Sequence, residues 1–218
     1  MKLYRGGIIV LFYRIVRAIS YPFLSLIFPT KIIGKNNFIH EKAVICCNHY
    51  SSLDSILVAT KLMREGCHCI GKEEAFKSKI SGWFLRKMGG IPIKRGENDL
   101  VAYRKILNVL KSGKQLLIFP EGTRNKSECA DIAPFHTGAA LFSIKSNAPI
   151  IPILLYGKPR PFKKNFIIIG EPFSLEKFAS LPSREMKEKA TEELYSRMFE
   201  MQKNFNNMIQ SSERRLLT

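Results

Sequence analysis

The sequence predicts an α/β fold with a mixed, largely parallel sheet flanked by helices, preceded by an N-terminal amphipathic helix that anchors the protein to a membrane. After residue 30, short apolar runs of strand length alternate with helix-length amphipathic segments, as in strand–helix–strand units with parallel pairing. The first 30 residues are the most apolar part of the chain and also carry a basic excess. We find no repeat or linker in the remainder. We therefore expect a membrane-associating segment at 1–30 and a single domain at 31–218.

The apolar segment 8–28 contains Arg14 and Arg17 near its middle. These arginines interrupt the apolar region that a cleaved signal peptide needs, and each would cost about 2.5–3.5 kcal/mol at the centre of a spanning helix. On a helix with about 100° per residue, both arginines fall on one side and a row of apolar side chains on the other. This pattern favours a basic amphipathic helix in the headgroup plane, bent or ended by Pro22. The alternative is an ordinary helix packed on the domain core.

The chain is strongly basic, with 35 lysines and arginines, 18 acidic residues and a net charge of +17. This charge indicates an anionic partner, whether nucleic acid, an acidic lipid surface or a phosphorylated substrate. Because the basic excess begins in the most apolar segment, a membrane surface fits better than DNA. We expect a peripheral or monotopic protein at the cytoplasmic face of the cell membrane, with no nucleic-acid partner. The charge alone leaves open a non-enzymatic binder of acidic lipid or nucleic acid.

The five cysteines do not indicate disulfides. Their number is odd, and Cys46 and Cys47 adjoin each other in an apolar run, as small buried residues do in a strand of a protein from a reducing compartment. Residues 67–69 read Cys-His-Cys. On a strand the two thiols would lie on one face and the imidazole on the other, and no second ligand cluster follows. No metal site is therefore expected.

The elements after residue 30 follow from apolar runs and helical periodicity. Strands are expected where short apolar runs stand between polar or glycine residues, at 43–47, 68–71, 91–94, 116–119, 150–155 and 166–169. Helices are expected where apolar residues recur every three or four positions, at 52–63, 80–88, 99–112, 138–146 and 183–209.

His49 and Asp54 lie between a strand that ends at Cys47 and a helix that begins near Ser52. Functional side chains are often mounted at such strand ends. Across this turn the Asp54 carboxylate can reach one imidazole nitrogen and leave the other as a base for a hydroxyl proton. The spacing equally allows His49 to cap the helix and Asp54 to be an acidic residue of its first turn. Because the chain contains no G-x-S-x-G motif, the hydroxyl is expected to belong to the substrate.

Other strand ends carry cations and one acid. The segment 119–124 reads Phe-Pro-Glu-Gly-Thr-Arg, a tight turn from which Glu121, Thr123 and Arg124 can project. Arg124 suits a phosphate because its planar guanidinium can bind two oxygens at once. The segment 89–95 begins with two glycines and ends in Lys94 and Arg95, of which only one would face the site, and a weaker signal of the same kind ends in Lys72. Each segment taken alone is equally consistent with a solvated surface turn.

Taken together, these segments resemble the glycerolipid acyltransferases. His49 and Asp54 match the family's H-x-x-x-x-D motif, the segment 119–124 reproduces its F-P-E-G-T-R block, and 89–95 and 148–153 resemble its two remaining blocks in the same order. The short length and the N-terminal segment are similar to those of the 1-acyl-sn-glycerol-3-phosphate acyltransferases. One departure is that the chain has His136 in a segment where the family often has a lysine.

The resemblance implies roles for the residues. His49 would deprotonate the sn-2 hydroxyl of lysophosphatidate, Asp54 would orient His49, and the substrate site would contain Lys72, Arg95, Glu121, Gly122, Thr123 and Arg124. The cations would hold the phosphate and Glu121 would position them. The acyl donor would be a thioester of coenzyme A or of acyl carrier protein, with no metal and no cofactor. Another lysophospholipid, glycerol 3-phosphate or a lyso-aminolipid remains an alternative acceptor.

Overall fold

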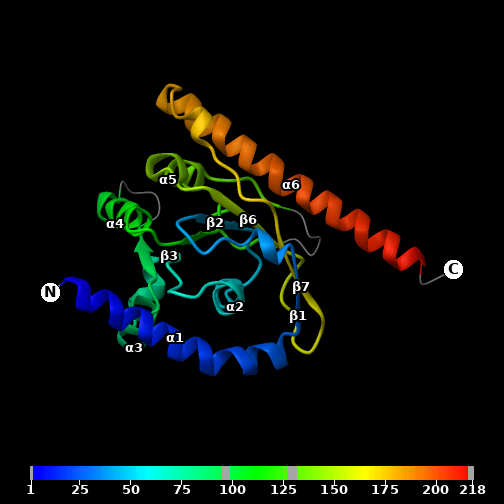
Figure 1. Ribbon diagram of the computed structural model, residues 1–218, viewed down its shortest axis with the longest axis horizontal. Coiled ribbons are helices and arrows are strands. Elements are labelled where there is room, and N and C mark those ends of the chain that lie inside the picture. Colours follow the sequence, from blue (N-terminus) through cyan, green and yellow to red (C-terminus); the bar gives the residue numbers. More distant parts are fainter. Residues whose placement is uncertain (1, 95–98, 127–131, 216–218) are drawn as a thin grey trace.

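Apolar runs form the strands of a mixed five-stranded sheet in the computed structural model, which describes residues 2–94, 99–126 and 132–215 (Figure 1). At its centre β2 (Val44–Cys47) lies between β5 (Leu116–Ile118) and β6 (Ile150–Leu155), and both pairings are parallel. Next to β6, β7 (Asn165–Ile169) runs antiparallel, and β1 (Thr30–Ile33) pairs with β7 in parallel. The predicted mixed, largely parallel sheet is confirmed.

A second, two-stranded sheet extends the first beyond β5. β3 (Ile70–Lys72) and β4 (Ile91–Ile93) are parallel, and Cys69 forms a parallel bridge with Leu117 of β5. The carboxyl ends of β2, β5, β6, β3 and β4 therefore all lie at one edge. Ligands bind at this edge in open α/β sheets.

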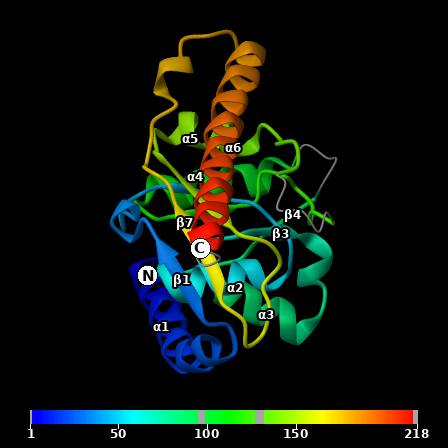
Figure 2. The ribbon, with the colours of Figure 1, turned by 90° about the vertical axis from the view of Figure 1, so that its right-hand side faces the viewer.

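Helices cover both faces of the sheet (Figures 1 and 2). One layer consists of α4 (Leu100–Lys111), α5 (Gly138–Ser146) and α6 (Ser183–Arg215). The other consists of α1 (Lys2–Ile27), α2 (Leu53–Leu62) and α3 (Lys79–Lys87). Three short 3-10 helices complete the described elements: η1 (Lys35–Asn37), η2 (Glu73–Phe76) and η3 (Glu176–Phe178).

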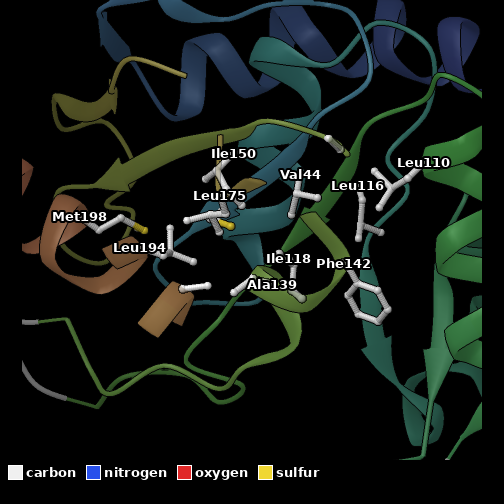
Figure 3. Packing of buried hydrophobic residues seen from close by; sticks show 14 of the residues in the cluster. Val44, Leu110, Leu116, Ile118, Ala139, Phe142, Ile150, Leu175, Leu194 and Met198 are labelled. Atoms are coloured by element: carbon white, nitrogen blue, oxygen red, sulfur yellow. The ribbon is translucent and has the colours of Figure 1, made fainter. Parts of the chain in front are cut away.

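The core beneath α4, α5 and α6 joins the central strands to the helices (Figure 3). Its fully buried side chains include Val44, Leu110, Leu116, Ile150 and Leu194. Burying a side chain of this size stabilises the fold by about 1.5–3 kcal/mol. This packing holds the sheet edge rigid, so the loops that follow the strands start from fixed points.

α1 packs against the domain through one side and leaves its apolar row outside. Tyr13 is buried, and its hydroxyl donates hydrogen bonds to the carbonyl oxygens of Ala59 and Met63. The outward row includes Leu11, Ile15 and Ile19, whose side chains are 60%, 51% and 62% exposed. Residues 9–27 form an apolar helix long enough to cross a membrane by length and composition. This feature is consistent with membrane association.

Most predicted elements are confirmed, with two corrections. Of the two outcomes expected at Pro22, the helix does not end there but continues to Ile27, bowed around the domain in Figure 1. β1, which begins at Thr30, was not predicted. α6 extends to Arg215, past the predicted end at 209, as a long rod that projects beyond the sheet (Figure 1).

Candidate active site at the carboxyl ends of the parallel strands

His49 and Asp54 meet directly in the turn between β2 and α2. The Nδ1 atom of His49 lies 2.9 Å from Oδ2 of Asp54, and that oxygen also accepts the backbone N–H groups of Tyr50 and Ser51 at 2.6 and 2.7 Å. Because Oδ2 acts as an acceptor throughout, the imidazole proton belongs on Nδ1. Nε2 is then left with its lone pair, in the state required of a base.

The surroundings hold this pair in one geometry. Asp54 is fully buried in the first turn of α2, and the His49 ring stacks on Phe119 with the ring centroids 4.1 Å apart. The His49 side chain is 18% exposed, so one edge of the ring remains accessible. His49 therefore neither caps α2, whose N-cap is Ser52, nor lies wholly within the core.

Glu121 joins the site through the backbone of His49. Its Oε1 atom accepts the His49 N–H at 2.9 Å, and the carboxyl group is buried. Burial, assisted by the negative charge of Asp54, raises the pKa of Glu121 to about 7, although the N–H groups of His49 and Ala133 act in the opposite direction. The segment 119–124 therefore places a carboxyl group whose charge changes near neutral pH against the backbone of His49.

The raised pKa of Glu121 predicts in which direction Glu121→Gln changes the melting temperature at each pH. The carboxyl titrates at its ordinary value of 4.5 when unfolded and at about 7 when folded, so the wild-type protein loses stability as the pH rises through this interval. Glutamine keeps an acceptor oxygen for the His49 N–H but does not ionise. We expect the two proteins to have similar melting temperatures at pH 5 and the variant to melt higher at pH 8. Thermal unfolding at both pH values checks this.

The matched control is Glu200→Gln, on the exposed surface of α6. It should shift the melting temperature by the same small amount at both pH values. Melting curves for Glu121→Gln that run parallel to the wild-type curve from pH 5 to pH 8 would contradict the burial account.

Asn48 was not predicted as a site residue, yet it ties the two strands that flank the site. It is fully buried, its Nδ2 donates to the carbonyl oxygen of Leu155, and its Oδ1 accepts the Leu155 N–H at 2.7 Å. These bonds link the residue before His49 to the end of β6. Asn48 directly precedes His49, but its partner at the end of β6 is 107 positions away, so the local sequence pattern did not indicate this link.

The turn that follows β5 is shaped by Gly122 and His136. Gly122 has a φ of 66°, and a Cβ atom there would lie 2.5 Å from the His136 ring. The His136 N–H donates to the carbonyl oxygen of Pro120 at 2.8 Å. His136 thus lies at the edge of the site, at the position where the chain departs from the family pattern.

The predicted phosphate-binding residues that the structure describes are exposed at the edge of the sheet where the parallel strands end. Thr123 and Arg124 are exposed, and the next residue, Asn125, donates its N–H to the His49 carbonyl oxygen at 2.6 Å. This bond brings the Arg124 backbone close to His49. Lys72 is exposed at the end of β3, at the same edge of the sheet. Arg95 lies outside the described residues.

The paired glycines before β4 allow a close approach to His68. Gly89 has a φ of 99°, and a Cβ atom there would lie 2.9 Å from Nδ1 of His68. Nδ1 of His68 also lies 3.3 Å from the Gly89 carbonyl oxygen, and burial lowers the pKa of His68 to about 4. His68 is therefore a neutral residue that packs under the glycine turn.

The cysteines beside the site are structural. Cys46 and Cys47 are fully buried free thiols in β2, and burial raises the pKa of both. A neutral thiol is a poor nucleophile. Within the described ranges no group of three or more His, Cys, Asp or Glu side chains is arranged to hold a metal ion.

Known proteins are similar to this chain in sequence. A family model described as Acyltransferase matches residues 29–156. The 1-acyl-sn-glycerol-3-phosphate acyltransferase of Bacillus subtilis is 30% identical over 192 residues, which are 85% of this chain and 94% of that protein. The protein of that name from Saccharomyces cerevisiae is 28% identical over 135 residues, 61% of this chain and 44% of its own length.

A solved structure shares the fold. The crystal structure of the 1-acyl-sn-glycerophosphate acyltransferase of Thermotoga maritima has a TM-score of 0.64 and 23% sequence identity, covering 88% of this chain and 79% of that one. Because the family model spans more than half of the sequence and the Bacillus subtilis relative is matched over nearly its full length, the chain belongs to the acyltransferase family.

Proposed function

We propose that the protein transfers a fatty acyl group from an acyl thioester to the sn-2 hydroxyl of 1-acyl-sn-glycerol 3-phosphate and so forms phosphatidic acid. The observation that carries the proposal is the 2.9 Å contact between His49 Nδ1 and Asp54 Oδ2, which leaves Nε2 to act as a base. The Bacillus subtilis relative named for this activity matches nearly the whole chain.

The reaction needs no nucleophile from the protein. Nε2 of His49 takes the proton of the sn-2 hydroxyl as its oxygen attacks the thioester carbonyl carbon. The carbon–sulfur bond then breaks, and the departing thiolate takes the proton from the imidazolium. Asp54 stabilises the imidazolium while it exists, as the acid does in a serine hydrolase triad. The products are phosphatidate and the free thiol.

The substrate phosphate lies among the cations of the strand ends in this proposal. Arg124 binds it bidentately, and Arg95 and Lys72 contribute further positive charge. Glu121, Gly122 and Thr123 form the turn that presents Arg124. The buried Glu121 carboxyl positions this turn by its hydrogen bond to the His49 backbone.

The substrates can be tested together. Purified protein is supplied with 1-acyl-sn-glycerol 3-phosphate and either acyl-CoA or acyl carrier protein thioester, and phosphatidate is followed by mass spectrometry. We expect phosphatidate with at least one donor and at least tenfold slower transfer to glycerol 3-phosphate or to a lysophospholipid without a terminal phosphate. Equal rates with the alternative acceptors would overturn the assignment of the acceptor.

The proposed location is the cytoplasmic face of the cell membrane, with residues 1–30 as the anchor and 31–218 as the catalytic domain. The outward apolar row of α1 supports this arrangement. The helix inserts this row among the lipids, while Tyr13 holds it to the domain.

Point substitutions test the anchor better than its deletion, because deletion would also uncover Ala59 and Met63. Each apolar side chain of the row contributes about 1.5–3 kcal/mol when it leaves water. The triple variant Leu11→Ser/Ile15→Ser/Ile19→Ser should therefore bind vesicles at least about 10³-fold more weakly. Sedimentation with anionic liposomes measures this.

The control substitutes an equally exposed apolar residue of α6, Phe199→Ser. It should sediment like the wild-type protein. Undiminished sedimentation of the α1 triple variant would show that the anchor lies elsewhere.

A further inference from the structure

The connection between β6 and β7, residues 157–164, combines an exposed aromatic tip with a cluster of cations. It reads Gly-Lys-Pro-Arg-Pro-Phe-Lys-Lys, and the whole segment 156–169 contains no acidic residue. Phe162 is 73% exposed, one of the most exposed large apolar side chains in the described structure. Flanking it, Arg160, Lys163 and Lys164 are exposed as well.

This connection holds a defined shape. Asn165 anchors it, since its Nδ2 donates to the carbonyl oxygens of Arg160 and Lys163 and its Oδ1 accepts the Arg160 N–H. Phe162 itself has a φ of 56°, which is uncommon for a residue with a side chain. The aromatic ring is thus presented to the outside at a local conformational cost, which is the pattern expected of a side chain with an external contact.

The connection also continues the surface of α1. The Phe162 N–H donates to the Ile27 carbonyl oxygen at 2.6 Å, and Asn165 donates its backbone N–H to the carbonyl oxygen of Pro29. At this end of α1, Phe23 and Leu26 are 63% and 72% exposed. Both ribbon views place the tip of the connection on the same side of the molecule as α1 and α3 (Figures 1 and 2).

We propose that residues 157–164 are a second membrane-binding element, which inserts Phe162 into an anionic bilayer beside α1 and binds the lipid phosphates through Lys158, Arg160, Lys163 and Lys164. An aromatic side chain within a basic cluster is suited to the boundary between headgroups and acyl chains. The inference rests on the proposed membrane association of α1. It adds a second contact point at the far end of that helix.

A second contact point would orient the active site. β6 leads from Leu155, which is tied to Asn48 beside His49, directly into the connection. One helix alone leaves the domain free to roll about the helix axis on the membrane. Contact through residues 157–164 as well fixes the angle at which the sheet edge faces the lipid that carries the substrate phosphate.

The sharpest test uses the single tryptophan of the chain, Trp83. The double variant Trp83→Phe/Phe162→Trp moves the only indole to the tip of the connection. With vesicles of phosphatidylcholine and phosphatidylglycerol, we expect its emission to shift to shorter wavelength and to be quenched by brominated acyl chains. If aqueous iodide quenches the tryptophan fluorescence of the vesicle-bound variant as strongly as that of the variant in free solution, the inference is overturned.

Measuring how variants partition into the same vesicles provides a second test. Phe162→Ser should weaken partitioning into these vesicles at least about tenfold, and Lys163→Glu/Lys164→Glu at least about 25-fold. Phe199→Ser and Lys203→Glu, exposed on α6, are the matched controls and should leave partitioning unchanged. Equal partitioning of all four variants would contradict the inference.

Acyl transfer to a short-chain, water-soluble lysophosphatidate separates the two proposals, because it needs no bilayer. The membrane contact is supported if all four variants turn over this substrate and, among them, only those changed at residues 162–164 bind vesicles more weakly. If the wild-type protein does not turn it over, the proposed acyltransferase activity fails whatever the vesicles show.

Discussion

Replacing His49 with alanine is expected to lower kcat for phosphatidate formation by about 10²–10⁴-fold, the range in which a positioned general base contributes. The imidazole contacts Asp54 Oδ2 through Nδ1, and the His49 side chain is 18% exposed. Steady-state kinetics with the preferred donor should show the loss in kcat, with KM for lysophosphatidate changed much less. A loss in kcat with little change in KM is expected when a group stabilises mainly the transition state.

The substitution should leave the fold intact, because the His49 backbone makes the contacts that hold the turn. Its N–H bonds to Glu121 and its carbonyl oxygen accepts the Asn125 N–H. His136→Ala is the matched control, a histidine at the edge of the site that should cost less than about tenfold. A folded His49→Ala protein with most of the wild-type kcat would refute the mechanism.

Asp54→Asn is expected to have an effect close to that of His49→Ala, with kcat lowered by up to about 10⁴-fold, as for the equivalent change in a serine hydrolase triad. Asp54 Oδ2 accepts three N–H groups, from the His49 ring and from the backbones of Tyr50 and Ser51. An amide keeps one acceptor oxygen for them but adds two donors at a buried position. The backbone groups compete for the oxygen, and the His49 ring then turns its proton to the wrong nitrogen.

A double-mutant cycle distinguishes this orienting role from separate contributions of the two residues. If Asp54 acts through His49, Asp54→Asn should cost little more in a protein that already carries His49→Ala. Kinetics of both single variants and the double variant measure the coupling. Additive losses in log kcat would contradict the orienting role, and a near-wild-type Asp54→Asn enzyme would remove it altogether.

Periodicity predicted the interior elements well, because their signals come from burial on the chain itself. β2 and β6 are apolar at every position and were placed correctly within a residue. β1 was missed because its pattern is only partly buried and its strand conformation depends on pairing with β7, 135 residues away between Thr30 and Asn165. Local sequence patterns do not reveal strand partners that are so far apart in the sequence.

The site could be predicted as a set of residue types but not as an arrangement. The spacing of His49 and Asp54 allowed both a base and a helix cap, and the structure shows the imidazole hydrogen-bonded to Asp54 in the β2–α2 turn rather than capping α2. The stacking of His49 on Phe119 and the link from Asn48 to Leu155 join residues 70 and 107 positions apart, so no local motif reports them. The raised pKa of Glu121 likewise depends on burial by the folded chain.

In the proposed mechanism, His49 activates the substrate hydroxyl directly, without an acyl-enzyme. The most direct measurement is release of the donor thiol, followed with a thiol reagent in the presence and absence of lysophosphatidate. We expect thiol release only when lysophosphatidate is present, with one phosphatidate formed per thiol. A burst of one thiol per enzyme without the acceptor, with a matching acyl mass on the protein, would contradict it.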